Sequence, residues 1–177
     1  MLHHMTKRAK FEFWAAGALL TFILIFVVYG LAQARTRVRD TLRQDDITNL
    51  KRAIEQYNNA FFAYPTPPNT EAACTETAPD SWLLGNDSPL VNGHFIDAIP
   101  HDVREKSGHL YRYCATVVEN GKTTGYYLEA ELEVDQSDII AFDEDEERKF
   151  AYRILHDGAR ILYRVCGGDE NQCNLEE

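Results

Sequence analysis

The stretch LKRAIEQYNNAFFAYPTPPN, Leu50 to Asn69, combines a helical pattern with an abrupt proline stop. Proline lacks the amide hydrogen that continues a helical ladder, and it drives the residue before it towards an extended backbone. The sequence therefore predicts a helix that ends close to Tyr64. Because no proline occurs between Met1 and Tyr64, the helical pattern can be followed back to the start of the chain without a break.

An uncharged apolar segment, residues 13–32 (FWAAGALLTFILIFVVYGLA), occupies the early part of this helix. About 20 apolar residues are enough to cross a hydrocarbon core of roughly 30 Å as a helix. We interpret the segment as a retained transmembrane anchor. The alternative is a cleaved secretory signal, for which LAQA at Leu31–Ala34 is a weak match to a cleavage site.

The orientation of the anchor is inferred from the cysteines, because basic residues flank the apolar segment on both sides. All four cysteines follow the anchor and none forms a C-x-x-C pair. That distribution favours disulfides in an oxidising compartment over a zinc site or free cytoplasmic thiols. We expect residues 1–12 to be a cytoplasmic basic leader and the rest to lie beyond the membrane. Proximity favours Cys166–Cys173, with Cys74–Cys114 as the second bridge, and the other pairings remain open.

Beyond the anchor, residues 33–63 continue the helix with an amphipathic pattern. The apolar positions recur mostly every three or four residues: Val38, Leu42, Ile47, Leu50, Ile54, Tyr57 and Phe61. Charged residues between them, including Asp40 and Arg43, are assigned to the polar outer face. One helix from about Phe11 to about Ala63 would be roughly 80 Å long. The apolar face from Ile47 to Phe61 needs a partner, and we expect the rest of the chain to cover it.

Residues 64–177 are predicted to form an extracytoplasmic loop followed by a small antiparallel sheet. HLYRYCATVV and TGYYLEAELEV alternate and flank a glycine turn, which predicts a hairpin from Leu110 to Val134. ARILYRVC supplies a further strand, for three or four in all. The tyrosines of the hairpin are interpreted as core and cross-strand residues rather than as a ligand groove. The predicted class is α+β, with the long N-terminal helix packed against the sheet.

Four stretches, taken in order, carry a resemblance to a known family: DITNLKRAIEQYNNAFFAYPT (Asp46–Thr66), FIDAIPHD (Phe95–Asp102), YRYCATVVENGKTTGYYLEAELE (Tyr111–Glu133) and CGGDENQC (Cys166–Cys173). Together with the half-membrane helix they resemble the type IV pilins, and most of all the major pseudopilins of type II secretion. The resemblance implies a structural subunit that assembles through its N-terminal helix into a pilus or pseudopilus. Its implied partners are other copies or related pilin-like subunits, the cytoplasmic membrane and assembly platform proteins.

The start of the helix departs from the family pattern. Pilin precursors carry a glycine before the processing point and an acid a few positions later, whereas here no glycine precedes Phe11 and Glu12 follows it at once. Glu12 either pairs with a neighbouring subunit or stays solvated beside Lys10. The residues expected to form the assembly and membrane surface are Glu12, Phe13, Trp14, Leu20, Phe22, Ile25 and Phe26. The missing glycine favours an alternative function, a single-pass anchored binding or sensor module that does not assemble.

Charge and motifs bound the remaining classes. The net charge of −10 argues against a nucleic-acid partner. No catalytic motif is present, so an enzyme is not expected. The resemblance places calcium, as a weaker alternative to a solvated acidic face, at Asp135, Asp138, Asp143 and Asp145. The spacing of these acids does not fit an EF-hand.

Overall fold

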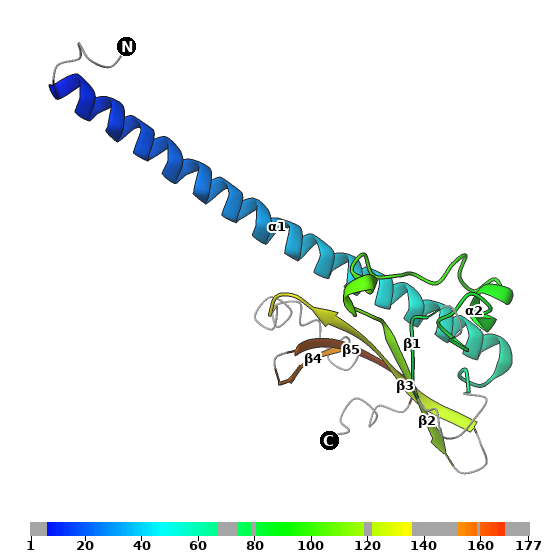
Figure 1. Cartoon of the computed structure of the whole chain (residues 1–177). Coiled ribbons are helices and arrows are strands. Elements are labelled where there is room, and N and C mark those ends of the chain that lie inside the picture. Colours follow the sequence, from blue (N-terminus) through cyan, green and yellow to red (C-terminus); the bar gives the residue numbers. More distant parts are fainter. Residues whose placement is uncertain are drawn as a thin grey trace. The chain divides into compact units, whose positions relative to one another are not determined.

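The computed structural model describes residues 7–66, 74–78, 81–118, 122–135, 152–158 and 160–168. The chain divides into two compact units, Met1–Val38 and Arg39–Glu177. The helix α1 (Lys7–Phe61) begins in the first unit and ends in the second, which holds the other helices and strands of the described residues (Figure 1). These are β1 (Cys74–Glu76), α2 (Pro89–Asn92), a 3-10 turn η1 (Glu105–Ser107), β2 (Arg112–Val118), β3 (Lys122–Leu132), β4 (Tyr152–Asp157) and β5 (Arg160–Gly168).

The helix α1 confirms the expectation of one long N-terminal helix, since it runs without interruption to Phe61. It ends just before the proline turn. Phe62 adopts a left-handed backbone with φ 54°, and its amide donates a 2.7 Å hydrogen bond to the Asn58 carbonyl. This is the usual αL cap of a helix C-terminus, here made by a residue other than glycine.

In the first unit, every described side chain of α1 from Phe11 to Arg35 is exposed. The large apolar residues from Phe11 to Leu31 are each between 49% and 75% exposed. This helix is long and apolar enough to cross a membrane. The apolar N-terminal helix predicted from the sequence is therefore confirmed. Its position in a membrane and its orientation stay predictions.

The second unit contains an antiparallel sheet of five strands in the order β1-β2-β3-β5-β4. The expected hairpin is confirmed as β2 and β3, which pair from Arg112 with Glu129 to Val118 with Lys122. The expected C-terminal strand is β5. Two short edge strands were not predicted: β1 lies in the stretch read as loop, and β4 precedes β5 as a hairpin partner. The sequence-based count of three or four strands was therefore too low.

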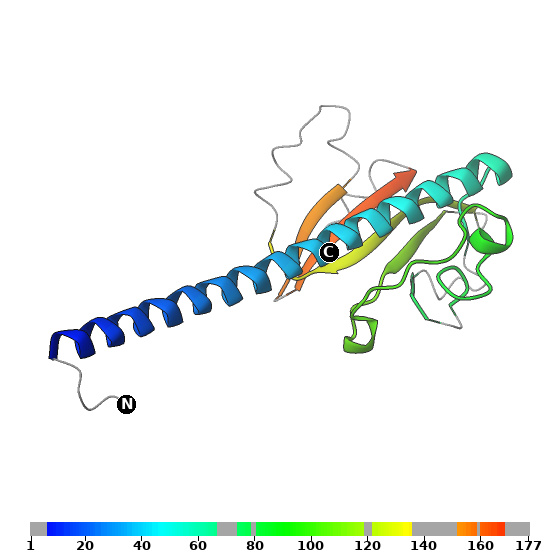
Figure 2. The same cartoon turned by 90° about the horizontal axis from the view of Figure 1, so that it is seen from above.

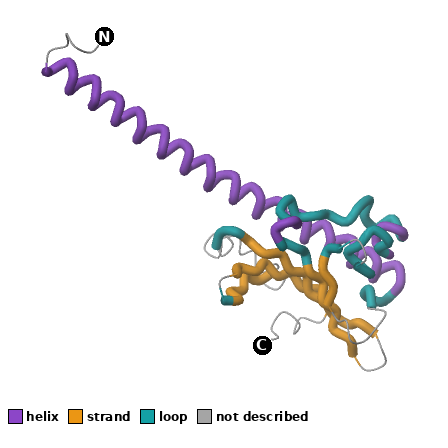
Figure 3. The backbone as a smooth tube through the Cα atoms, viewed as in Figure 1, coloured by secondary structure: helices purple, strands orange, loops and turns teal. Residues whose placement is uncertain are grey.

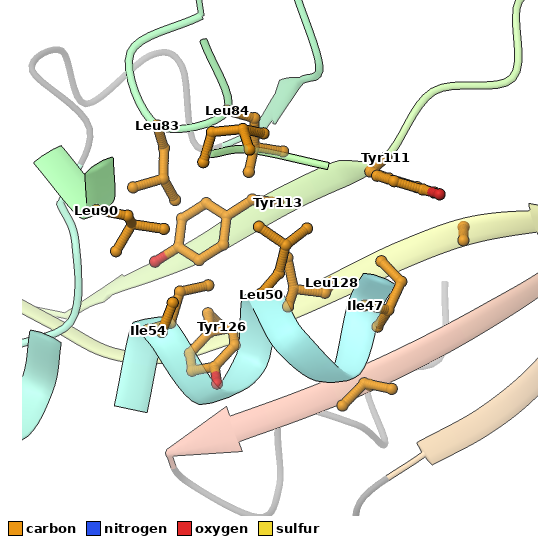
Figure 4. Close-up of a cluster of buried hydrophobic side chains, with 14 of the residues drawn as sticks. Ile47, Leu50, Ile54, Leu83, Leu84, Leu90, Tyr111, Tyr113, Tyr126 and Leu128 are labelled. Atoms are coloured by element: carbon orange, nitrogen blue, oxygen red, sulfur yellow. The ribbon is translucent and has the colours of Figure 1, made fainter. Parts of the chain in front are cut away.

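The part of α1 in the second unit lies across one face of this sheet, and both perpendicular views show this arrangement (Figures 1 and 2). Ile47, Leu50 and Ile54 are fully buried in the core. They face Tyr113, Tyr126 and Leu128 of the sheet, as labelled in Figure 4. Burying a side chain of this size stabilises the fold by about 1.5–3 kcal/mol. The α+β packing predicted from the sequence is thus present.

Loops between β1 and β2 complete the core beside the C-terminal part of α1 (Figure 3). Leu83, Leu84 and Leu90 are fully buried there. The short helix α2 brings in Leu90. Ser88 caps its start by accepting a 3.2 Å hydrogen bond from the Leu90 amide, and Pro89 occupies the first turn.

The structure corrects the assignment of helix faces between residues 38 and 43. Val38 and Leu42, expected on the apolar packing face, are 59% and 49% exposed, whereas Asp40 and Arg43, expected on the polar face, are buried. The cause is helix geometry. Arg43 comes seven residues before Leu50 and so lies within about 20° of it around the helix, while Leu42 is about 80° away.

Candidate functional site: the contacts that fix α1 to the sheet

Two polar clusters join α1 to the sheet within the second unit. The arginine cluster consists of Arg39, Asp40, Arg43, Asp102, Arg104 and Glu133. The Tyr-Pro-Thr cluster consists of Glu55, Tyr64, Pro65, Thr66, Tyr113, Thr123 and Tyr126. Neither cluster had been predicted as a site.

Arg43 is the centre of the arginine cluster, and its side chain is only 2% exposed. Its Nη1 lies 2.7 Å from the Asp40 carboxylate on the preceding turn of α1. Its Nε donates to Asp102, from the loop before η1, and its Nη2 lies 2.9 Å from Glu133, just after β3. One guanidinium therefore links three segments that are far apart in the sequence.

Glu133 receives two further arginines. Arg39 donates from Nε at 2.8 Å and from Nη2 at 2.6 Å, and Arg104 donates from Nη1 at 2.8 Å. The hydrogen bonds from Arg39 lower the pKa of Glu133 to about 2; burial opposes that shift, and the Arg43 contact adds to it. Glu133 is therefore ionised at neutral and mildly acidic pH.

Asp40 closes the cluster through the backbone. Its carboxylate accepts 3.0 Å hydrogen bonds from the amides of Glu133 and Val134. The end of β3 is thus bonded to α1 by main-chain donors as well as by arginines. Three carboxylates face three guanidiniums, so the buried charges are compensated and hydrogen-bonded, the condition under which such charges are tolerated.

Glu55 organises the Tyr-Pro-Thr cluster at the other end of the packed helix. Tyr126 of β3 donates to its Oε1 at 2.9 Å, and Tyr64 donates to its Oε2 at 3.2 Å. Burial, reinforced by the Glu55 charge, raises the pKa of Tyr64 to about 12, and burial likewise raises the pKa of Tyr126. A Cβ at Gly167 would overlap both the Tyr126 ring and the Glu55 carboxylate, so a larger residue there would have to displace these two side chains.

The proline turn itself is bonded to the hairpin. Tyr113 of β2 donates a 2.8 Å hydrogen bond to the carbonyl of Pro65, which is buried. Thr123 of β3 donates to the Thr66 hydroxyl at 3.0 Å. The turn that ends the helix is therefore also the point where the chain after α1 is attached to the sheet.

Between the two clusters, Tyr111 donates a 2.6 Å hydrogen bond to the Asp46 carboxylate on α1. Burial raises the pKa of Asp46 in spite of this bond. Asp46 directly precedes the buried core residue Ile47 on α1. Its contact adds a third polar link between helix and sheet.

The residues predicted to pack the helix against the head differ in their burial. Ile47, Leu50 and Ile54 are buried, and Tyr57 packs against the core. Phe61 contacts two aromatic rings, with its ring centroid 4.6 Å from that of Tyr57 and 6.0 Å from that of Phe95. It is nevertheless 58% exposed and is not part of the buried core.

The residues predicted to form the membrane and assembly surface are all exposed in the first unit: Glu12, Phe13, Trp14, Leu20, Phe22, Ile25 and Phe26. They belong to the continuous helix α1. No other described residue covers these side chains.

The bridge Cys74–Cys114 is present and joins directly opposed residues of β1 and β2. Cys166 is also disulfide-bonded, and its expected partner Cys173 lies outside the described residues. Of the hairpin tyrosines, Tyr111, Tyr113 and Tyr126 lie in the core as expected. Tyr127 faces the other way, with the Arg164 guanidinium 4.4 Å from its ring.

The acidic residues considered for calcium are only partly covered by the structure. Asp135 is exposed and its carboxylate lies 3.0 Å from His156 Nε2, while Asp138, Asp143 and Asp145 lie outside the described residues. Within the described ranges, no three histidine, cysteine or acidic side chains gather in a way that could hold a metal ion.

A signal for the arginine cluster exists in the sequence. Asp40 and Arg43 are three residues apart, and Arg43 precedes Leu50 by one heptad, which places a charge on the packing face. Such a charge needs a buried partner, but the sequence does not indicate that Asp102 and Glu133 supply it.

These contacts define the class of the protein: an α+β head fixed to the C-terminal part of an N-terminal helix that is apolar enough to cross a membrane. Comparison of the chain with protein-family models, with curated proteins and with solved structures finds no match.

Proposed function

We propose that this protein is a membrane-anchored, pilin-like structural subunit that assembles with other copies, or with related subunits, through the apolar part of α1. The observation that carries the proposal is the continuous exposure of this part of the helix. Its large side chains from Phe11 to Leu31 are each at least 49% exposed.

Such a surface is costly in water, at roughly 25 cal/mol per Å² of apolar area. In the membrane, lipid covers this apolar surface. In a filament core, neighbouring helices of the same kind would cover it. Gly17, within the small-residue run Ala15–Ala18, has open space around its Cα, so another helix can approach closely there. Small residues at such positions favour helix association in membranes.

The contacts in the head support the same function. A subunit that assembles through one helix must hold that helix firmly to its folded part. The arginine cluster and the Tyr-Pro-Thr cluster do so at two separate places along α1, from Arg39 to Glu55. The order of the four pilin-like stretches in the sequence adds independent support.

The test is to shear cells that express the full chain and to examine the released material by electron microscopy and gel filtration. The proposal expects filaments or large oligomers that contain the chain. Material that stays entirely in the membrane fraction as a monomer would instead indicate the anchored, non-assembling module.

A further inference from the structure

A small hollow lies on the face of the sheet that is turned away from α1. Its volume is about 70 Å³, and its wall includes Leu110, Arg112, Glu129, Glu131, Arg160 and Leu162. Along β3, Leu128, Ala130 and Leu132 point into the core, so Glu129 and Glu131 point to the opposite face. We call this site the outer-face hollow.

Most charges at the outer-face hollow are already paired. Arg112 lies 2.7 Å from Glu76, Glu129 lies 2.6 Å from Arg164, and Arg160 donates to Asp157. Glu131 differs, because it is half-buried and has no ion-pair or hydrogen-bond partner among the described residues. The hollow therefore carries one uncompensated negative charge beside the apolar walls formed by Leu110 and Leu162.

The opposite side of the second unit carries the matching charge. Arg52 is exposed and, like Glu131, has no ionic partner in the described part of the chain. It follows Leu50 by two residues, so it lies about 200° around α1 from the buried face and points away from the sheet. The other charged residue on this stripe, Asp45, is seven residues earlier, or about 10 Å along the helix.

We infer that the outer-face hollow is a docking site for a second copy of this chain, whose Arg52 enters it and pairs with Glu131. The inference rests on the proposed assembly and specifies its contact between heads. The guanidinium meets the unpaired carboxylate, and the aliphatic stem of the arginine packs on Leu110 and Leu162, as long basic side chains do on apolar surfaces.

The geometry of this contact suits a growing assembly. The donor Arg52 and the acceptor Glu131 lie on opposite sides of the same unit, so the interface is head-to-tail rather than two-fold symmetric. Contacts of that kind leave a free donor and a free acceptor after each addition, and they generate rings or filaments rather than closed dimers.

A charge-reversal cycle on the full chain in membranes tests the inference. Glu131→Arg and Arg52→Glu are each expected to lower the yield of chemically cross-linked oligomers by roughly fivefold or more, because each brings like charges together. The double variant restores the opposite charges and is expected to recover most of the yield. Equal yields in all four proteins would overturn the inference, and so would a double variant as poor as the singles.

Asp97→Lys is a matched control for Glu131→Arg, because it reverses an exposed acidic side chain that does not line the outer-face hollow. It should leave the yield unchanged. A thermal unfolding scan of each variant separates loss of contact from loss of fold. If the unmodified chain forms no oligomers, the proposed function fails. If it forms oligomers whose yield is the same in the unmodified chain and in the three charge-reversal variants, only the docking inference fails.

Discussion

At Arg43 a charged side chain occupies a position that helix geometry reserves for the core. It is tolerated because three carboxylates surround it, from Asp40, Asp102 and Glu133. Buried ion pairs of this kind add little net stability over an apolar packing, but removing one partner leaves the others uncompensated. We therefore expect the cluster to fix the position of α1 on the sheet more than to add net stability.

Arg43→Met should lower the free energy of unfolding by about 3–5 kcal/mol, because Asp40 and Asp102 would stay buried without a cation. Arg104→Ala is the matched comparison, since Arg104 pairs with the same Glu133 but is 46% exposed and should cost no more than about 1 kcal/mol. Urea unfolding of the detergent-solubilised full chain measures both. Equal losses would show that burial does not set the strength of these pairs.

Glu133 gives the cluster a defined acid sensitivity. Its pKa falls from 4.5 in the unfolded chain to about 2 in the folded one. Its contribution is therefore complete above about pH 5 and is lost as the pH falls towards 2, by on the order of 3 kcal/mol in all. Asp46, whose pKa is raised, acts with the opposite sign.

The measurement is the midpoint of urea unfolding between pH 6 and pH 2, for the unmodified chain and for Glu133→Gln. The variant should be less stable at pH 6 and should lose less stability on acidification. Parallel pH curves for the two proteins would contradict the assignment of this acid sensitivity to Glu133.

Among the elements, those with long regular patterns could be predicted from the sequence. The helix end follows from the proline run after Tyr64, and β2, β3 and β5 follow from alternation. The strand β1 could not be predicted, because Cys74–Glu76 is a three-residue edge strand with no alternation of its own. The disulfide from Cys74 to Cys114, the Glu76–Arg112 ion pair and the Thr77 contact with Tyr111 hold it in place.

The arginine cluster could not be predicted either, because it also depends on contacts between residues that are far apart in the sequence. A cluster made by Arg43, Asp102 and Glu133 depends on tertiary contacts across 59 and 90 residues of sequence, and no local pattern encodes them. The reading of charges as an outer face assumed that polar residues lie outside. That assumption fails where paired charges are buried.

The disulfide between Cys74 and Cys114 holds the short edge strand β1 on the sheet. The bridge spans 40 residues of sequence, so its removal should lower the free energy of unfolding by about 2–4 kcal/mol. Hydrogen exchange should increase first in β1 and the paired part of β2. The double variant Cys74→Ser with Cys114→Ser, compared with the unmodified chain by hydrogen-exchange mass spectrometry, tests this. Unchanged protection of β2 would contradict the role given to the bridge.

At the scale of the whole molecule, α1 has an apolar part that needs lipid or other helices, and the head holds the other end of α1 through buried polar contacts. The proposed head-to-tail contact between Arg52 and Glu131 is secondary to this. An assembly driven by α1 would weaken without that contact, but it would not disappear. The central claim is that the apolar part of α1 packs against its own kind.

Cysteine-scanning cross-linking along residues 13–32, in membranes that hold the full chain, measures this packing most directly. The account predicts ladders of linked oligomers, strongest at positions that repeat with the helical period of about 3.6 residues and include the neighbourhood of Gly17. Monomers at every position, under conditions that cross-link a known membrane dimer, would contradict it.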